Sequence, residues 1–130
     1  MNSASQIVID ALQETINNPV HSEEKIAVYF SSDYRQQVDG KHLNYDEFVK
    51  HMALLKTKTQ RMTVSLLSIV AEGDTVFTHH QVNVEKSEGG NSLFEVLAHY
   101  RLSSDQIVNC QELTRMISGE NGDRDLGSRR

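Results

Sequence analysis

The sequence predicts an α+β domain in which three N-terminal helices cover one face of a curved antiparallel sheet. As far as Lys58, apolar residues recur every three or four positions, which is the helical period. After Lys58, strand-like alternation dominates, and short polar turns separate the segments as in antiparallel hairpins. The 130 residues, 38% hydrophobic and 24% charged, suit one soluble domain over 1–117 and a polar tail over 118–130.

The first two helices are defined by their ends. The spacing of apolar residues predicts a helix over 3–17, which stops because Pro19 disfavours helical geometry at the residue before it. A second helix is expected to begin at Ser22, where the following Glu23 complements the helix dipole. We expect it to end at 31–33, a run of two serines and an aspartate.

A short strand over 34–38 and a turn at 39–40 lead to the third helix. Asn44 is the expected N-cap, and Glu47 follows three residues later, as in a capping box. The buried stripe of this helix comprises Phe48, Met52 and Leu55.

Four strands are predicted after the helices, over 61–71, 75–85, 93–102 and 106–116. On the third, alternation puts Val96, Ala98 and Tyr100 on the core face. A three-residue turn at 103–105 places Val96 opposite Glu112 and Ala98 opposite Cys110. The core face of the last strand is then Val108, Cys110, Glu112 and Thr114, whereas a two-residue turn would flip this assignment.

The same alternation points His80 inward and His79 outward on the second of these strands. A buried ionisable group is costly unless it is paired or used, so Glu112 and His80 are the candidate catalytic residues. The outer face of the sheet mixes apolar and polar side chains, which suits a subunit interface: His79, Gln81, Leu97, His99, Gln111 and Leu113.

Four segments carry a family resemblance: 29–34, 39–41, 44–49 and the final hairpin from 100–102 to 107–109. With the order of elements, they make residues 4–117 resemble the nuclear transport factor 2-like (NTF2-like) superfamily, in its SnoaL-like polyketide cyclase branch. The resemblance implies a cone-shaped, strongly bent sheet (a cystatin/NTF2-like α+β roll), a deep pocket closed by the helices, and commonly a homodimer. The tail over 122–129 also resembles one found in uncharacterised bacterial members.

The functional motif of the cyclases is only partly present. They carry His-Trp-Asp on the last strand with the Asp as acid/base, and here the triplet is Cys110-Gln111-Glu112. Where they often have Gln-His after the tyrosine of the short strand, this chain has Gln36-Gln37, and His80 lies too early on its strand to match their partner histidine. These departures weaken the cyclase assignment.

Two interpretations of each candidate residue stay open. Glu112 is either a general base with a raised pKa or the ion-pair partner of Arg115 or another cation. His80 either protonates or orients a substrate oxygen or is a hydrogen-bonded core histidine. Tyr34 and Tyr100 either donate hydrogen bonds into the pocket or simply pack. The residues expected to contact a ligand are Tyr29, Tyr34, Val96, Tyr100 and Cys110.

Composition limits the remaining possibilities. The net charge of −5 argues against nucleic-acid binding, and the cations Lys50, Lys56, Lys58 and Arg61 are interpreted as a solvated helix face. The single cysteine, the absence of a signal peptide and the lack of a long apolar run favour a cytoplasmic protein without a membrane segment. No His or Cys spacing resembles a zinc site, so no metal or cofactor is expected.

We therefore expect a homodimer that pairs through the outer sheet face and binds an apolar or semi-polar small molecule. If it is catalytic, the expected chemistry is proton transfer, as in an isomerase, cyclase or dehydratase. Two alternatives are a non-catalytic binding or dimerisation module, and a protein–protein adaptor acting through the outer face.

Overall fold

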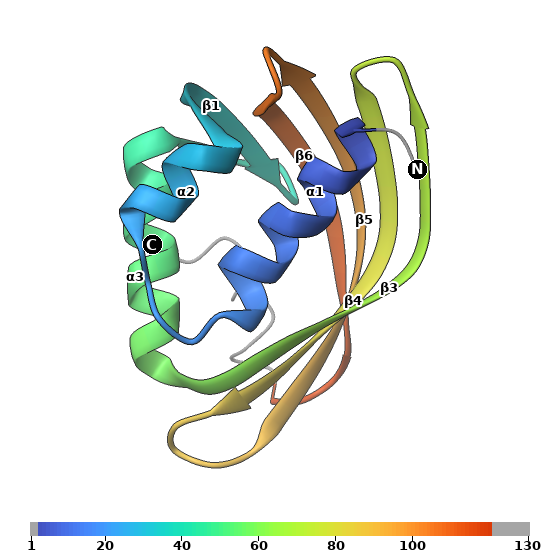
Figure 1. Cartoon of the computed structure of the whole chain (residues 1–130). Helices are drawn as coiled ribbons and strands as arrows, with labels where there is room; N and C mark the ends of the chain where they lie inside the picture. Colours follow the sequence, from blue (N-terminus) through green and yellow to red (C-terminus); the bar gives the residue numbers. More distant parts are fainter. Residues whose placement is uncertain (1–2, 121–130) are drawn as a thin grey trace.

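The computed structural model describes residues 3–120. Three α-helices, α1 (Ser3–Leu12), α2 (Glu23–Tyr29) and α3 (Tyr45–Lys58), lie on the concave side of one sheet (Figure 1). A π-helical turn, η1 (Gln13–Asn17), continues α1. The strands are β1 (Phe30–Val38), β2 (Lys41–Asn44), β3 (Thr59–Glu72), β4 (Thr75–Lys86), β5 (Asn91–Ser103) and β6 (Gln106–Ser118).

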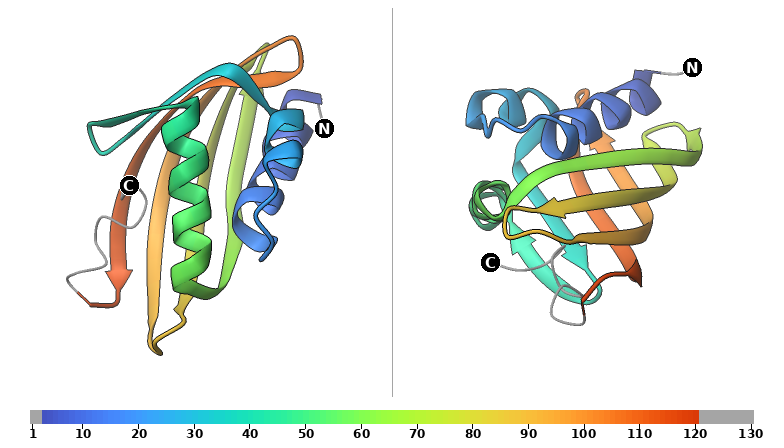
Figure 2. Two further views of the ribbon diagram at one scale, coloured as in Figure 1. Left: turned by 90° about the vertical axis from the view of Figure 1, so that its left-hand side faces the viewer. Right: turned by 90° about the horizontal axis from the view of Figure 1, so that it is seen from below.

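The six strands follow the order β2-β1-β6-β5-β4-β3 and are antiparallel except for the parallel pair β1–β6. Extra residues interrupt the pairing at Gln60 and Leu67 on β3 and at Val108 and Ile117 on β6. Such bulges bend a strand and increase its twist. The result is the bent sheet of Figure 2, which confirms the predicted α+β fold.

The second helix ends earlier than predicted. It stops at Tyr29, and Phe30 already has extended backbone angles, φ −116° and ψ 131°. Phe30 pairs with Ile107 in β6, and its ring centroid lies 4.8 Å from that of Tyr34 and 4.9 Å from that of Phe48. The strand predicted over 34–38 therefore begins at Phe30, because pairing with a strand far along the sequence outweighs the local helical pattern.

The third helix begins as predicted. The Asn44 side chain accepts a hydrogen bond from the backbone N–H of Glu47 at 2.9 Å, and the Glu47 carboxylate accepts one from the N–H of Asn44 at 3.1 Å. Lys56 departs from the expected solvated face. Its ammonium donates to the carbonyl oxygens of Glu14 at 3.3 Å and Val20 at 3.1 Å, and burial lowers its pKa. Lys56 thus ties α3 to η1 and the segment after it.

The register between β5 and β6 corrects the prediction in two places. The turn has two residues, Ser104 and Asp105, both with positive φ, so Ser103 pairs with Gln106. By itself this turn would reverse the faces of β6, but the bulge at Val108 reverses them again.

The two effects cancel along most of β6. Glu112 therefore faces inward as predicted, but its partner is Ala98, and Cys110 pairs with Tyr100. The core position near the turn belongs to the fully buried Ile107, not to Val108 as predicted.

Candidate functional site

A cavity of about 130 Å³ lies between α1, η1, α3 and the concave face of the sheet. An engineered cavity of about 150 Å³ with an apolar lining can hold benzene, so this chamber has the size of a single-ring guest. Its wall is mostly apolar, and its polar members come from all the surrounding layers: Thr15, Tyr34, Gln36, His51, His80, Tyr100, Glu112 and Thr114.

Glu112 brings a carboxyl group to this wall. It is half-buried, and the thiol of Cys110, two residues earlier on β6, donates a weak hydrogen bond to Oε2 of Glu112 at 3.5 Å. Burial raises the pKa of Glu112 from 4.5 to about 7; the Cys110 contact opposes this shift, and the negative charge of Asp39 adds to it. The carboxyl group can therefore bind or release a proton near neutral pH.

The proposed pairing of Glu112 with Arg115 is wrong. Arg115 lies on the outer face, where its guanidinium contacts Oε1 of Glu95 at 3.0 Å through both Nε and a terminal nitrogen. His79 also points outward, as predicted, and its Nε2 lies 2.8 Å from Oε2 of Glu95. The charged network of the sheet is thus on the face opposite the cavity.

Asp39 holds β6 at Glu112 and at Thr114, a role that the sequence reasoning missed. Its backbone N–H donates to the carbonyl oxygen of Glu112 at 3.0 Å, and its Oδ1 accepts from the N–H of Thr114 at 2.8 Å. Oδ2 accepts from the Thr114 hydroxyl. Asp39 adopts φ 51° in the β1–β2 turn, a conformation that Asp tolerates better than most residues.

His80 is buried on β4, on the cavity side. Its Nδ1 lies 2.9 Å from the Thr78 hydroxyl, and burial, with a contribution from His79, lowers its pKa to about 4. The imidazole is therefore neutral at pH 7. Strand β5 lies between His80 and Glu112, so these two side chains border the cavity from different strands.

The two tyrosines of the wall differ in their partners. The Tyr34 hydroxyl donates to Oε1 of Gln36 at 2.8 Å. The buried hydroxyl of Tyr100 has no hydrogen-bond partner among residues 3–120, although Thr78 and Cys110 are near enough to influence its pKa. Burial is the main reason that the pKa of each phenol is raised, so both keep their protons at physiological pH.

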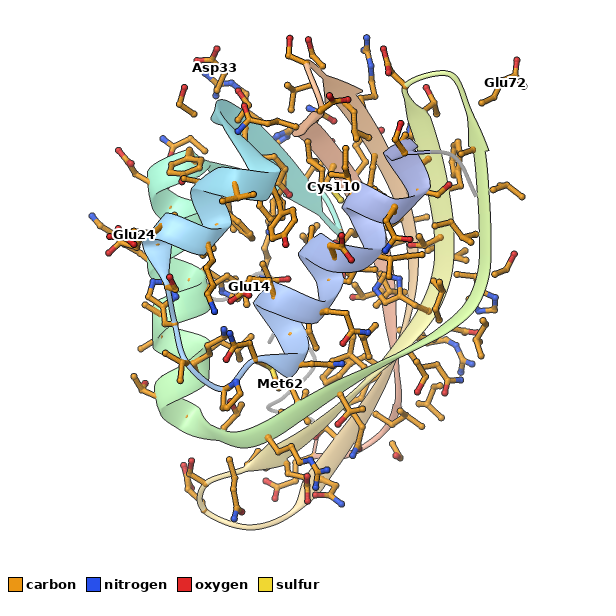
Figure 3. All side chains as sticks on the ribbon, in the orientation of Figure 1. Glu14, Glu24, Asp33, Met62, Glu72 and Cys110 are labelled. Carbon is orange, nitrogen blue, oxygen red and sulfur yellow. The ribbon has the colours of Figure 1, made fainter. Side chains whose placement is uncertain are left out.

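The remaining predicted ligand contacts divide into two groups. Val96 borders the cavity together with both tyrosines, whereas Tyr29 and Cys110 do not. Tyr29 packs at the edge of the core, and Cys110 lies in the interior on β6, with its pKa raised mainly by burial (Figure 3). Cys110 thus acts on the site through its contact with Glu112 and through its proximity to Tyr34 and Tyr100.

Gln36 and His51 border the cavity and were not predicted. A signal for each was present in the sequence. Gln36 lies two positions from both Tyr34 and Val38 on β1, so it shares their inward face. His51 follows Phe48 by three positions on the buried face of α3.

No group of three or more His, Cys, Asp or Glu side chains within residues 3–120 is placed to hold a metal ion. Among the helices of the described chain, none combines the length and the apolar character needed to cross a bilayer. The predicted tail over 118–130 lies beyond the described residues from 121 onward.

Comparison with solved structures identifies the fold. IdmH from Streptomyces antibioticus, a candidate polyketide cyclase, superimposes with a TM-score of 0.74 and 17% identity over 87% of this chain and 92% of that one. A candidate SnoaL-like polyketide cyclase from Jannaschia gives 0.72 with 12% identity over 86% and 85%. An LEH-like epoxide hydrolase from Mycobacterium tuberculosis gives 0.70 with 14% identity over 87% and 83%. The chain therefore has the same fold as SnoaL-like and NTF2-like proteins.

No family model matches the sequence. The chain is 32% identical over 128 residues to the uncharacterized protein C11D3.04c of the fission yeast Schizosaccharomyces pombe, with 98% of each chain covered. This chain and the yeast protein therefore belong to the same family. A bacterial source and a cytoplasmic location stay predictions.

Proposed function

We propose that this protein binds a small, largely apolar carbonyl compound in its cavity and that Glu112 accepts a proton from the carbon beside the carbonyl group. One observation carries the proposal: a single carboxyl group faces an apolar chamber that also contains the unpartnered hydroxyl of Tyr100. An apolar site that holds a few convergent polar groups is the usual form of a small-molecule site.

The chemistry follows from the protonation states. A general base works best when its pKa lies near the operating pH, and the pKa of Glu112 is about 7. The carboxylate takes the proton, the electron pair of the broken C–H bond moves into the carbonyl group, and negative charge develops on oxygen. The neutral Tyr100 and His80 side chains are hydrogen-bond donors that can stabilise that charge.

The comparisons support this proposal at the level of the fold. Proteins with the same architecture include an epoxide hydrolase and candidate polyketide cyclases, so the fold is compatible with catalysis in the cavity. We do not extend the proposal to cyclisation, because Cys110 and Gln111 stand where the cyclases carry His and Trp.

Deuterium exchange tests the proton transfer without knowledge of the natural substrate. Acetophenone is a single-ring ketone with exchangeable methyl protons, and its uptake of deuterium in D₂O is measured by mass spectrometry. We expect catalysed exchange that rises with pH through about 7 and falls by about 10²- to 10⁴-fold in Glu112→Gln. Glu95→Gln, on the outer face, is the matched control and should retain the rate. Exchange that is equal in wild type and Glu112→Gln would exclude Glu112 as the base.

A non-catalytic binder is the second candidate. It is favoured by the cavity wall, in which most of the lining side chains are apolar. It predicts that Glu112→Gln keeps its affinity for acetophenone while neither protein exchanges deuterium. Native mass spectrometry of freshly purified protein would reveal a co-purified molecule and so identify the ligand directly.

We also propose that the protein dimerises through the outer face of the sheet. A groove there contains exposed Val70, Phe77, Leu97 and Leu113, and the Phe77 ring stacks on His99 at 4.4 Å. Its polar members, such as Gln37 and Gln111, both donate and accept hydrogen bonds, so a two-fold axis can pair the face with itself.

The charge distribution also favours the binding of a second copy of this chain to the outer face. The chain carries a net charge of −5, but the outer-face carboxylate Glu95 is already paired with His79 and Arg115, and Glu112, which also borders the groove, has a pKa raised to about 7. Light scattering should therefore show a dimer that Leu113→Lys converts to monomers. A wild-type monomer would exclude the dimer and favour the adaptor role for this face.

A further inference from the structure

We propose that the Gln36 amide and the Tyr100 hydroxyl jointly bind one oxygen atom of the ligand, which makes the ligand a ring-sized apolar molecule with a neutral carbonyl group. The inference rests on the proposed function because it requires a guest in the cavity. It adds a binding site for the carbonyl oxygen and a residue that sequence reasoning did not select.

The Gln36 side chain presents a free donor to the cavity. It is 6% exposed, borders the chamber, and accepts the Tyr34 hydroxyl through Oε1 at 2.8 Å. That bond orients the amide, so its NH₂ group is directed elsewhere, and the structure gives this nitrogen no partner among residues 3–120. An unmatched donor in an apolar wall is costly, which favours a site completed by an acceptor.

Tyr100 supplies the second donor. Its side chain is 4% exposed and borders the same cavity, and its hydroxyl is likewise without a partner among the described residues. Two unsatisfied donors on one apolar wall are consistent with a single carbonyl oxygen, which has two lone pairs and accepts two hydrogen bonds.

The sheet register puts these donors on either side of one strand. Gln36 on β1 and Tyr100 on β5 both pair with Cys110 on β6, so two strand spacings, about 10 Å, separate their Cα atoms. Both side chains extend from the concave face and can approach an atom between them. Glu112 lies two residues beyond Cys110 on the same face, beside the place for the carbon next to the carbonyl.

Charge disfavours a carboxylate as the oxygen-bearing group. The acidic Glu112 shares this wall, the lining contains no lysine or arginine among the described residues, and the imidazole of His80 is neutral at pH 7. A second anion would be repelled by a charged Glu112 and would find neither of these cations. A neutral ketone or aldehyde has the oxygen acceptor without the charge.

Tyr34 is the positioning residue for Gln36. Its ring lies 4.8 Å from Phe30 and 4.9 Å from Phe48, centroid to centroid, so aromatic packing on two sides fixes the hydroxyl that holds the amide. Loss of this hydroxyl frees the amide to rotate and should weaken oxygen binding without changing the volume of the cavity appreciably.

Acetophenone and α-methylstyrene test the proposal because they share one shape and differ only in C=O against C=CH₂. Titration by NMR should show that wild-type protein binds acetophenone at least about tenfold more tightly, as expected for two hydrogen bonds to one oxygen. The infrared carbonyl band of bound acetophenone should also lie at lower frequency than in an apolar solvent.

Variants assign the effect to the named donors. The double variant Tyr34→Phe/Gln36→Leu removes both partners of one bond, and Tyr100→Phe removes the other donor. Each should weaken acetophenone binding by about fivefold or more and leave α-methylstyrene binding within about twofold. Gln60→Leu, on the exposed surface of β3, is the matched control and should change neither affinity.

The outcomes separate this inference from the function on which it rests. Equal affinity for the two probes, with an unshifted carbonyl band, overturns the oxygen site and leaves cavity binding in place. Binding of neither probe overturns both proposals. If a variant fails to fold, the wild-type affinity ratio and carbonyl band decide the question alone.

Discussion

Replacing Glu112 by glutamine should stabilise the protein at alkaline pH, although it removes the residue on which the proposed chemistry depends. The substitution keeps the size and shape of the side chain and removes its charge. The wild-type protein must place a carboxylate against an apolar cavity once the pH exceeds the pKa of Glu112, whereas the glutamine variant never does. Active-site groups that cost stability are a common trade-off.

The magnitude follows from the two protonation states. A carboxyl pKa raised from 4.5 to about 7 on folding corresponds to about 3 kcal/mol. Below about pH 4.5 the carboxyl group is protonated in folded and unfolded chains, so it contributes no difference. Between 4.5 and 7 the folded chain binds more protons, and the free energy of unfolding therefore falls as the pH rises. Above 7 the full penalty remains.

Urea unfolding of both proteins between pH 4.5 and 8.5 measures this difference. The gap between Glu112→Gln and wild type should widen with pH and level off above about 7. Glu95→Gln is a control of opposite sign, because His79 and Arg115 lower the pKa of Glu95, so it should lose stability at neutral pH. A gap between Glu112→Gln and wild type that does not vary with pH would refute a buried, high-pKa carboxyl group.

Three further results are expected. The NMR signals of the His80 ring should stay those of a neutral imidazole from pH 8 to 5, and its contribution to stability should be lost as the pH falls from about 6.5 towards 4; a midpoint near 6.5 would contradict its burial. Asp39→Asn should lower the pKa of Glu112, seen as a downward shift in the midpoint of the deuterium-exchange profile, and an unchanged midpoint would exclude the charge effect. Asn44→Ala should cost about 1 kcal/mol in urea unfolding because the capping box of α3 is lost, and no change would make the cap irrelevant.

The fold could be predicted because its signals are local. The capping box at Asn44, the proline after the first helix and the alternation along β4 and β5 each specify an element within a few residues. The start of β1 at Phe30 could not be read in the same way. It depends on pairing with Ile107 and on aromatic contacts to Phe48, which join segments far apart in the sequence.

The candidate site was only partly accessible to such reasoning. The inward orientation of Glu112 and His80 follows from alternation, and the structure agrees for both. The prediction for Glu112 nevertheless used a turn one residue too long and a strand without a bulge, and these two errors cancelled. Gln36 was missed because only its bond to Tyr34 and its position beside Cys110 show what it can do.

The unpaired Val108 makes the character of the interior depend on one bulged residue. If Val108 instead paired with Arg101, β6 would continue in regular pairing from the Ser104–Asp105 turn, and each later side chain would exchange faces. Leu113 would then occupy the interior and Glu112 the outside. A chain of the same composition would have a hydrocarbon-filled centre without space for a guest, although its strand order would be unchanged.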